Sequence, residues 1–151
     1  MKKIQIGDKL PSFKLLNQKG KWINISDFIG RPLIIYFYPK DDTPGCTKEA
    51  CTFRDEYSSF VDFGASVFGV SADSVESHHA FSVKYQLPFD LLSDEGNKLR
   101  KVFGVPSDLF GMIPGRVTYV VDSRGFVKYI FNNQLNATKH IEEALKALGS
   151  F

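Results

Sequence analysis

The sequence predicts an α/β fold, in which helices cover both faces of a mixed β-sheet. Two runs of apolar, β-branched and aromatic residues, 32–38 and 65–71, have the composition of strands that are buried on both faces. Segments with a helical spacing of apolar residues follow both runs, and hairpins at 13–25 and 116–131 add antiparallel strands. Strands that alternate with helices along the chain are typical of α/β folds.

In the first part of the chain, the hairpin consists of 13–16 and 22–25, joined by the turn sequence NQKG. The buried strand RPLIIYFYP follows it. The next segment has apolar residues at the spacing of an amphipathic helix, namely Ala50, Phe53, Tyr57, Phe60 and Val61. We therefore expect one helix over 44–62.

In the second part of the chain, Asp73 or Ser74 can cap the helix that follows 65–71, because either side chain can accept a hydrogen bond from a free N–H group. A short strand at 89–93 and a short helix ended by Gly104 come next. The second hairpin turns at DSRG. The final helix has four apolar residues on one face, namely Ala137, Ile141, Leu145 and Leu148.

Length and composition favour a single domain over 1–151. With 151 residues and 43% hydrophobic content, the chain can bury one core of ordinary size. The 19 basic and 17 acidic residues leave a net charge of +2, which is too small to indicate binding to nucleic acid or an anionic membrane. The longest apolar run, 32–38, is too short to cross a bilayer, and no apolar signal core follows the N-terminus. We expect a soluble chain whose partners are small molecules or proteins.

Both cysteines of the chain lie in the stretch YPKDDTPGCTKEAC, five positions apart. On a helix, Cys46 falls within the apolar stripe, whereas Cys51 lies about 140° away on the polar face. If Thr43 is the N-cap, Pro44 occupies the first helical position and Cys46 the third. Free N–H groups and the helix dipole there favour a thiolate and lower a thiol pKa, so Cys46 is a candidate nucleophile.

A permanent disulfide or simple packing explains this cysteine pair poorly. Packing as a small buried hydrophobe suits Cys46 but not Cys51, which has no reason to sit on the polar face. In a straight helix their Cα atoms would lie roughly 8.6 Å apart, beyond the roughly 7 Å limit for a bridge without backbone movement. The spacing therefore predicts a bond that forms during turnover, when the helix unwinds locally.

These segments resemble the peroxiredoxin family, and specifically its Q-type, or bacterioferritin comigratory protein, subgroup. The resemblance rests on YPKDDTPGCTKEACTFRD, LPFDLLSDEGNKLRKVFGVP and FGMIPGRVTYVVD, and it covers nearly the whole chain. Pro39, Thr43 and Cys46 match the family motif, Cys51 matches the second cysteine of the subgroup, and Arg116 matches the family's catalytic arginine. The resemblance implies a thioredoxin-like fold with an N-terminal hairpin extension, and the reduction of hydrogen peroxide and organic hydroperoxides.

The resemblance also implies a role for each matched residue. Cys46 would be the peroxidatic thiol and Cys51 the resolving thiol, joined transiently by an intramolecular disulfide that thioredoxin or a similar dithiol reduces. Arg116 would hold the thiolate and the peroxide, Thr43 would orient the peroxide, and Pro39 would shield the sulfur from water. No metal, haem or flavin is needed. The subgroup favours a monomer, located in the cytoplasm, or in the chloroplast if a transit peptide has been removed.

Two other classes of function stay open on the residues alone. A thioredoxin-type disulfide exchanger uses C-x-x-C, whereas this chain has C-x-x-x-x-C. A non-enzymatic binding or holdase module would keep its function if Cys46 were replaced by serine. A structural zinc site is disfavoured, because two cysteines without a paired histidine cannot supply four ligands.

The remaining candidate side chains are expected to be structural. Arg54 is too far along the helix to touch the Cys46 sulfur, and an ion pair with Asp55 or Glu56 suits it better. Arg124 is expected to be solvated in the hairpin turn. Three residues are expected to be surface or half-buried histidines, namely His78, His79 and His140.

Overall fold

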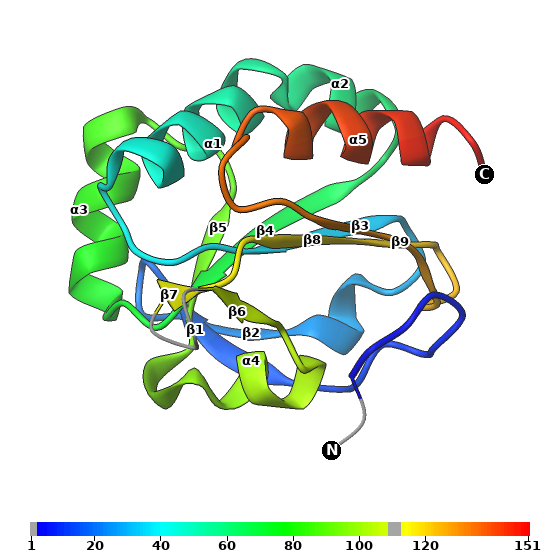
Figure 1. Cartoon of the computed structure of the whole chain (residues 1–151), viewed down its shortest axis with the longest axis horizontal. Coiled ribbons are helices and arrows are strands. Elements are labelled where there is room, and N and C mark those ends of the chain that lie inside the picture. The colour runs from blue at the N-terminus through cyan, green and yellow to red at the C-terminus, as the bar shows by residue number, and fades with distance from the viewer. Residues whose placement is uncertain (1–2, 109–112) are drawn as a thin grey trace.

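A seven-stranded mixed sheet forms the centre of the molecule (Figure 1), in the order β2-β1-β5-β4-β3-β8-β9. The computed structural model describes residues 3–108 and 113–151. Strands β3, β4 and β5 are parallel, whereas β8 and β1 pair antiparallel with β3 and β5. The strand bounds are β1 Lys14–Asn17, β2 Trp22–Asn24, β3 Leu33–Phe37, β4 Ser66–Ser71, β5 Asp90–Ser93, β8 Val117–Val121 and β9 Val127–Asn132. The predicted mixed sheet and both hairpins are confirmed.

Strand β3 is buried along its whole length, as its continuous apolar sequence predicts. Ile34 and Tyr36 belong to the core on one face of the sheet, and Leu33, Ile35 and Phe37 to the core on the other face. Successive side chains of a strand point to opposite faces, so one apolar run supplies both cores.

Helices cover both faces of the sheet. Figure 1 shows α1 (Pro44–Asp55), α2 (Tyr57–Asp62) and α5 (Lys139–Leu148) over one face and α4 (Lys98–Phe103) across the sheet from them. Helix α3 (Val75–Tyr85) packs beside β5, and the Ser74 side chain caps it by accepting from Ser77 N. In the part of the chain that is described, every helix is too short or too polar to cross a membrane.

The structure corrects the expected helix over 44–62, which is divided into α1 and α2. Glu56 leaves the helical conformation, with φ −98° and ψ 10°. The apolar pattern could not reveal this break, because Phe53 before it and Phe60 after it enter the same core, with ring centroids 5.5 Å apart.

Other differences concern short elements. Ile25 begins a 3₁₀ turn, Ile25–Phe28, instead of ending a strand. A 3₁₀ turn, Glu95–Asn97, precedes α4, which ends as expected at Gly104 with a positive φ of 67°. A small ribbon, β6 (Ser107–Asp108) with β7 (Ile113–Pro114), was not predicted, because two-residue strands carry no alternation. The start of the expected FGMIPGRVTYVVD segment, residues 110–112, lies outside the described residues.

Candidate active site

Cys46 lies in the first turn of α1, where the sequence places it. Thr43 is the N-cap residue and Pro44 the first helical residue, so Cys46 is the third. The Cys46 side chain is 1% exposed and belongs to the core between α1 and the sheet. The Thr43 hydroxyl does not cap the helix but donates to Lys40 O at 2.9 Å. The first-turn N–H groups therefore stay available beside a buried sulfur.

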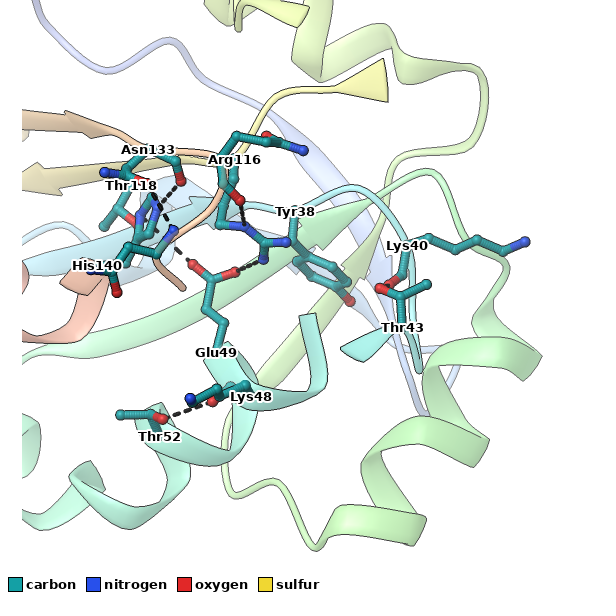
Figure 2. A network of polar contacts seen from close by, with 12 residues as sticks. Tyr38, Lys40, Thr43, Lys48, Glu49, Thr52, Arg116, Thr118, Asn133 and His140 are labelled. Atoms are coloured by element: carbon teal, nitrogen blue, oxygen red, sulfur yellow. Dashed lines mark hydrogen bonds and ion pairs between the residues drawn. The ribbon is translucent and has the colours of Figure 1, made fainter. Parts of the chain in front are cut away.

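Arg116, which directly precedes β8, reaches the first turn of α1 from the other side of the site. Its guanidinium is buried, with Nη1 donating to Glu49 Oε1 at 2.6 Å and Nε donating to Gln134 O at 3.2 Å. Gly45 allows this approach, because a Cβ at that position would lie 3.0 Å from Arg116 Nη2. Figure 2 shows the Arg116 guanidinium meeting the Glu49 carboxylate.

The charges of the site centre on Arg116. Burial lowers the pKa of Arg116, but the negative charges of the nearby Glu49 and Cys46 side chains raise it by more, so the net shift is upward. Burial raises the pKa of Glu49 to about 8, although Arg116 acts in the opposite direction. One guanidinium thus serves two acidic groups, the Glu49 carboxyl and the Cys46 thiol.

Glu49 is the site residue that our sequence reasoning missed. It is fully buried, yet it lies about 60° from Cys46 on the helix, within the apolar stripe. A carboxyl group in an apolar stripe needs a buried cationic partner, and that signal could have found it. Its Oε1 has this partner in Arg116, whereas its Oε2 has no hydrogen bond.

His140 closes the network on the far side of Glu49 (Figure 2), with Nδ1 3.7 Å from Glu49 Oε2. His140 Nε2 lies 2.7 Å from Asn133 O, which can only accept, so Nε2 carries the proton and Nδ1 accepts from the Thr118 hydroxyl at 2.8 Å. Burial lowers the pKa of His140 to about 4. The expectation of a surface or half-buried histidine is wrong here, because this hydrogen-bond network compensates for the burial.

The loop between β3 and α1, which carries Pro39 and Thr43, is anchored at Asp41. The Tyr38 hydroxyl donates to Asp41 Oδ1 at 2.6 Å, and His78 Nδ1 lies 2.7 Å from Asp41 Oδ2. His78 Nε2 faces Leu92 O at 3.1 Å. His78 is fully buried, so the expectation of a surface or half-buried position is wrong for it too, whereas His79 is exposed as expected.

Asp41, Asp73 and His78 also offer atoms that could hold a metal ion, within 4.8 Å of one another. These atoms are already engaged in hydrogen bonds. The His78 ring faces Asp41 Oδ2, and Asp73 Oδ2 accepts from the Asp41 backbone N–H at 2.9 Å. The cluster is thus explained as the anchor of the loop.

The other predicted residues lie at the margin of this centre. Pro39 and Thr43 are half-buried in the loop that leads to Cys46. Cys51 is half-buried rather than exposed, burial raises its pKa, and it is not bonded to Cys46. Arg54 pairs with Asp55 at 3.0 Å, as expected. The structure therefore brings Cys46, Thr43 and Arg116 to one turn of α1, and leaves Cys51 further along the helix.

Comparison with known proteins gives consistent likenesses. A sequence model of the AhpC/TSA family matches residues 6–130. The chain is 57% identical over 148 residues to "Peroxiredoxin Q, chloroplastic" of Sedum lineare, covering 98% of this chain and 80% of that protein. It is 54% identical over 146 residues to the Arabidopsis thaliana protein of the same name, covering 97% of this chain and 68% of that protein.

Solved structures agree with these likenesses. The Mycobacterium tuberculosis peroxidoxin BcpB superposes with a TM-score of 0.90 at 32% identity, covering 98% of each chain. The bacterioferritin comigratory protein of Xanthomonas campestris, described for its alkyl peroxide reduction activity, superposes with a TM-score of 0.85 at 32% identity. That match covers 95% of this chain and 98% of the other. These likenesses confirm the expected thioredoxin-like fold.

Proposed function

The chain belongs to the AhpC/TSA family and is a peroxidase of the peroxiredoxin type, and we propose that Cys46 is the thiol that attacks the peroxide. One observation carries this proposal: the Cys46 sulfur is buried at a helix start, where the Arg116 guanidinium meets the same turn. A cation and free N–H groups favour the thiolate, which is the reactive form of a thiol.

In the proposed reaction, the Cys46 thiolate attacks the terminal oxygen of a hydroperoxide. An S–O bond forms while the O–O bond breaks, so Cys46 becomes a sulfenic acid and the other oxygen leaves as alkoxide or hydroxide, which takes up a proton. Negative charge thus moves from sulfur to the leaving oxygen. Arg116 is placed to stabilise that charge, because its guanidinium is held by Glu49 and need not reorganise.

Thr43 and Pro39 have supporting roles in this proposal. The Thr43 hydroxyl hydrogen is engaged by Lys40 O, which leaves the oxygen lone pairs free to accept a hydrogen bond from the peroxide O–H. Pro39 is half-buried at the end of the loop and would limit access of water to the sulfur. Thr43 would thus hold the peroxide in line with the thiolate.

We further propose that Cys51 attacks the Cys46 sulfenic acid, forming the disulfide and releasing water. This step needs α1 to open, because both cysteines are unbonded members of one helix. A dithiol reductant then restores both thiols, and thioredoxin is our candidate.

We propose a single domain over 1–151 that acts as a monomer, since both reacting thiols belong to one chain. The names of the plant relatives favour a chloroplast over a cytoplasmic location.

The test is peroxide consumption coupled to thioredoxin, thioredoxin reductase and NADPH, with hydrogen peroxide and with an organic hydroperoxide. The native protein is compared with Cys46→Ser and Cys51→Ser. We expect turnover by the native protein, no activity in Cys46→Ser, and in Cys51→Ser one turnover that yields a sulfenic acid trapped by dimedone.

Other outcomes assign the failure to a particular part of the proposal. Full activity of Cys46→Ser would overturn the role of Cys46. Repeated turnover by Cys51→Ser would overturn the resolving role of Cys51. If the native protein forms the disulfide with peroxide but thioredoxin does not reduce it, the reductant alone is wrong.

A further inference from the structure

Arg100, on α4, links the two backbone segments that lead into Arg116 and Pro39, two residues of the proposed peroxide site. Its Nη1 donates to Gly115 O at 2.8 Å, and its Nη2 donates to Tyr38 O at 3.1 Å. The Gly115 carbonyl belongs to the peptide bond that leads into Arg116, and the Tyr38 carbonyl to the one that leads into Pro39. A single guanidinium therefore holds the peptide planes directly before both residues.

Arg100 is itself held firmly. It is 7% exposed, and its Cζ lies 5.6 Å from the centre of the Phe37 ring. The buried Asp94 carboxylate accepts from the backbone N–H groups of Leu99 and Arg100, at 2.8 and 2.9 Å. Asp94 thus fixes the start of α4 and supplies a negative charge near the guanidinium. These contacts restrict the side chain to one arrangement.

We propose that Arg100 is a positioning residue for peroxide reduction, which keeps Arg116 and Pro39 at their distances from Cys46. This inference rests on the proposed function. Helix α4 lies across the sheet from α1 (Figure 1), so Arg100 acts on the site from behind through backbone carbonyls. The planar fork of arginine can donate to both carbonyls at a fixed separation, whereas lysine offers a single point donor.

The test compares Arg100→Met and Arg100→Lys with Lys101→Met, a matched control that removes a charge from an exposed position of the same helix. Three quantities are measured on reduced protein: the second-order rate of Cys46 sulfenic acid formation with hydrogen peroxide, the alkylation rate of Cys46 by iodoacetamide, and the urea midpoint of unfolding. Alkylation reports the thiolate without requiring the peroxide to be held.

We expect Arg100→Met to lower the peroxide rate by about 100-fold, the effect of a misplacement of about 1 Å in a reacting group. Its alkylation rate should fall far less than the peroxide rate, because alkylation depends on Arg116 only through the thiolate, which the first-turn N–H groups of α1 also favour. Arg100→Lys should recover part of the peroxide rate, and Lys101→Met should match the native protein.

A merely structural role gives a different result. If the peroxide rate of folded Arg100→Met is within twofold of native, or falls only in proportion to the folded fraction, the proposal is overturned. Where Arg100→Met does not fold, Arg100→Lys decides, and a native peroxide rate in that variant overturns the proposal as well. Failure of the proposed function is recognised separately, because the native protein would then form no sulfenic acid on Cys46.

Discussion

Arg116 Nη1 lies 2.6 Å from Glu49 Oε1, and both side chains are almost completely removed from solvent. Glu49 also stands between Cys46 and Cys51 on α1. In our proposal a disulfide between the two cysteines requires this part of α1 to unwind, and unwinding would separate the Glu49 carboxyl from Arg116. The contact between Glu49 and Arg116 therefore couples the proposed disulfide step to the opening of α1, and it stabilises the helical form.

The same buried carboxyl makes stability depend on pH. Burial raises the pKa of Glu49 from 4.5 to about 8. The protonated carboxyl is the form that the folded protein favours, and its contribution to the free energy of unfolding is complete below pH 4.5. Above that value the unfolded chain has released a proton that the folded protein still holds, so stability falls as pH rises toward 8, by up to about 1.4 kcal/mol per pH unit.

We expect Glu49→Gln, which does not titrate, to lack this decline. The measurement is urea unfolding of the native protein and of Glu49→Gln from about pH 5 to about pH 8. Parallel stability profiles of the two proteins would contradict the prediction.

Gly45→Ala tests the close approach of Arg116 to α1. The added Cβ would lie 3.0 Å from Arg116 Nη2, so the guanidinium must shift. We expect the peroxide rate to fall by roughly tenfold through misplacement. Stability should change by no more than about 1 kcal/mol, because the helix preference of alanine over glycine opposes the cost of moving the buried guanidinium.

Gly149→Ala is the matched control for this substitution, since its Cβ would meet only ordinary contacts of 3.7 Å or more. The rate of sulfenic acid formation and the urea midpoint are measured for both variants. A normal peroxide rate in Gly45→Ala would show that Arg116 need not lie against this turn.

His78→Ala tests the anchor of the loop. The substitution leaves the buried Asp41 carboxylate without its imidazole partner, so we expect the free energy of unfolding to fall by about 3 kcal/mol. His79→Ala changes the exposed neighbouring histidine and should alter it by no more than about 0.5 kcal/mol. Urea unfolding measures both, and equal effects would argue against the anchor.

Amide hydrogen exchange tests the opening of α1. We expect amides at 47–51 to exchange at least about tenfold faster in the oxidised protein than in the reduced protein, because a bridge requires loss of helical hydrogen bonds there. Amides of α3 serve as the internal reference and should not change. Identical exchange at 47–51 in the two redox states would contradict the prediction.

The sequence predicted the helix start that carries Cys46, because a helix start is recognisable from neighbouring residues. Thr43, Pro44 and Cys46 occupy the predicted positions at the helix start, where a cap and a proline are recognisable over a few residues. The break in the helix at Glu56 was not predicted, because Phe53 before it and Phe60 after it enter the same core. Residues whose partners are distant in the chain left no comparable signal.

The two buried histidines are the clearest example. The sequence suggested surface or half-buried positions for His78 and His140, but Asp41 and Thr118 accommodate them in the interior from 37 and 22 residues away. The sequence by itself determined the strands of the main sheet, the start of α1 and the buried position of Cys46, because these depend on the spacing of neighbouring residues. Only the tertiary structure decided that Glu49 would pair with Arg116, 67 residues away, and that Arg100 would donate to Gly115 O and Tyr38 O. Such contacts form only when the sheet brings distant segments together.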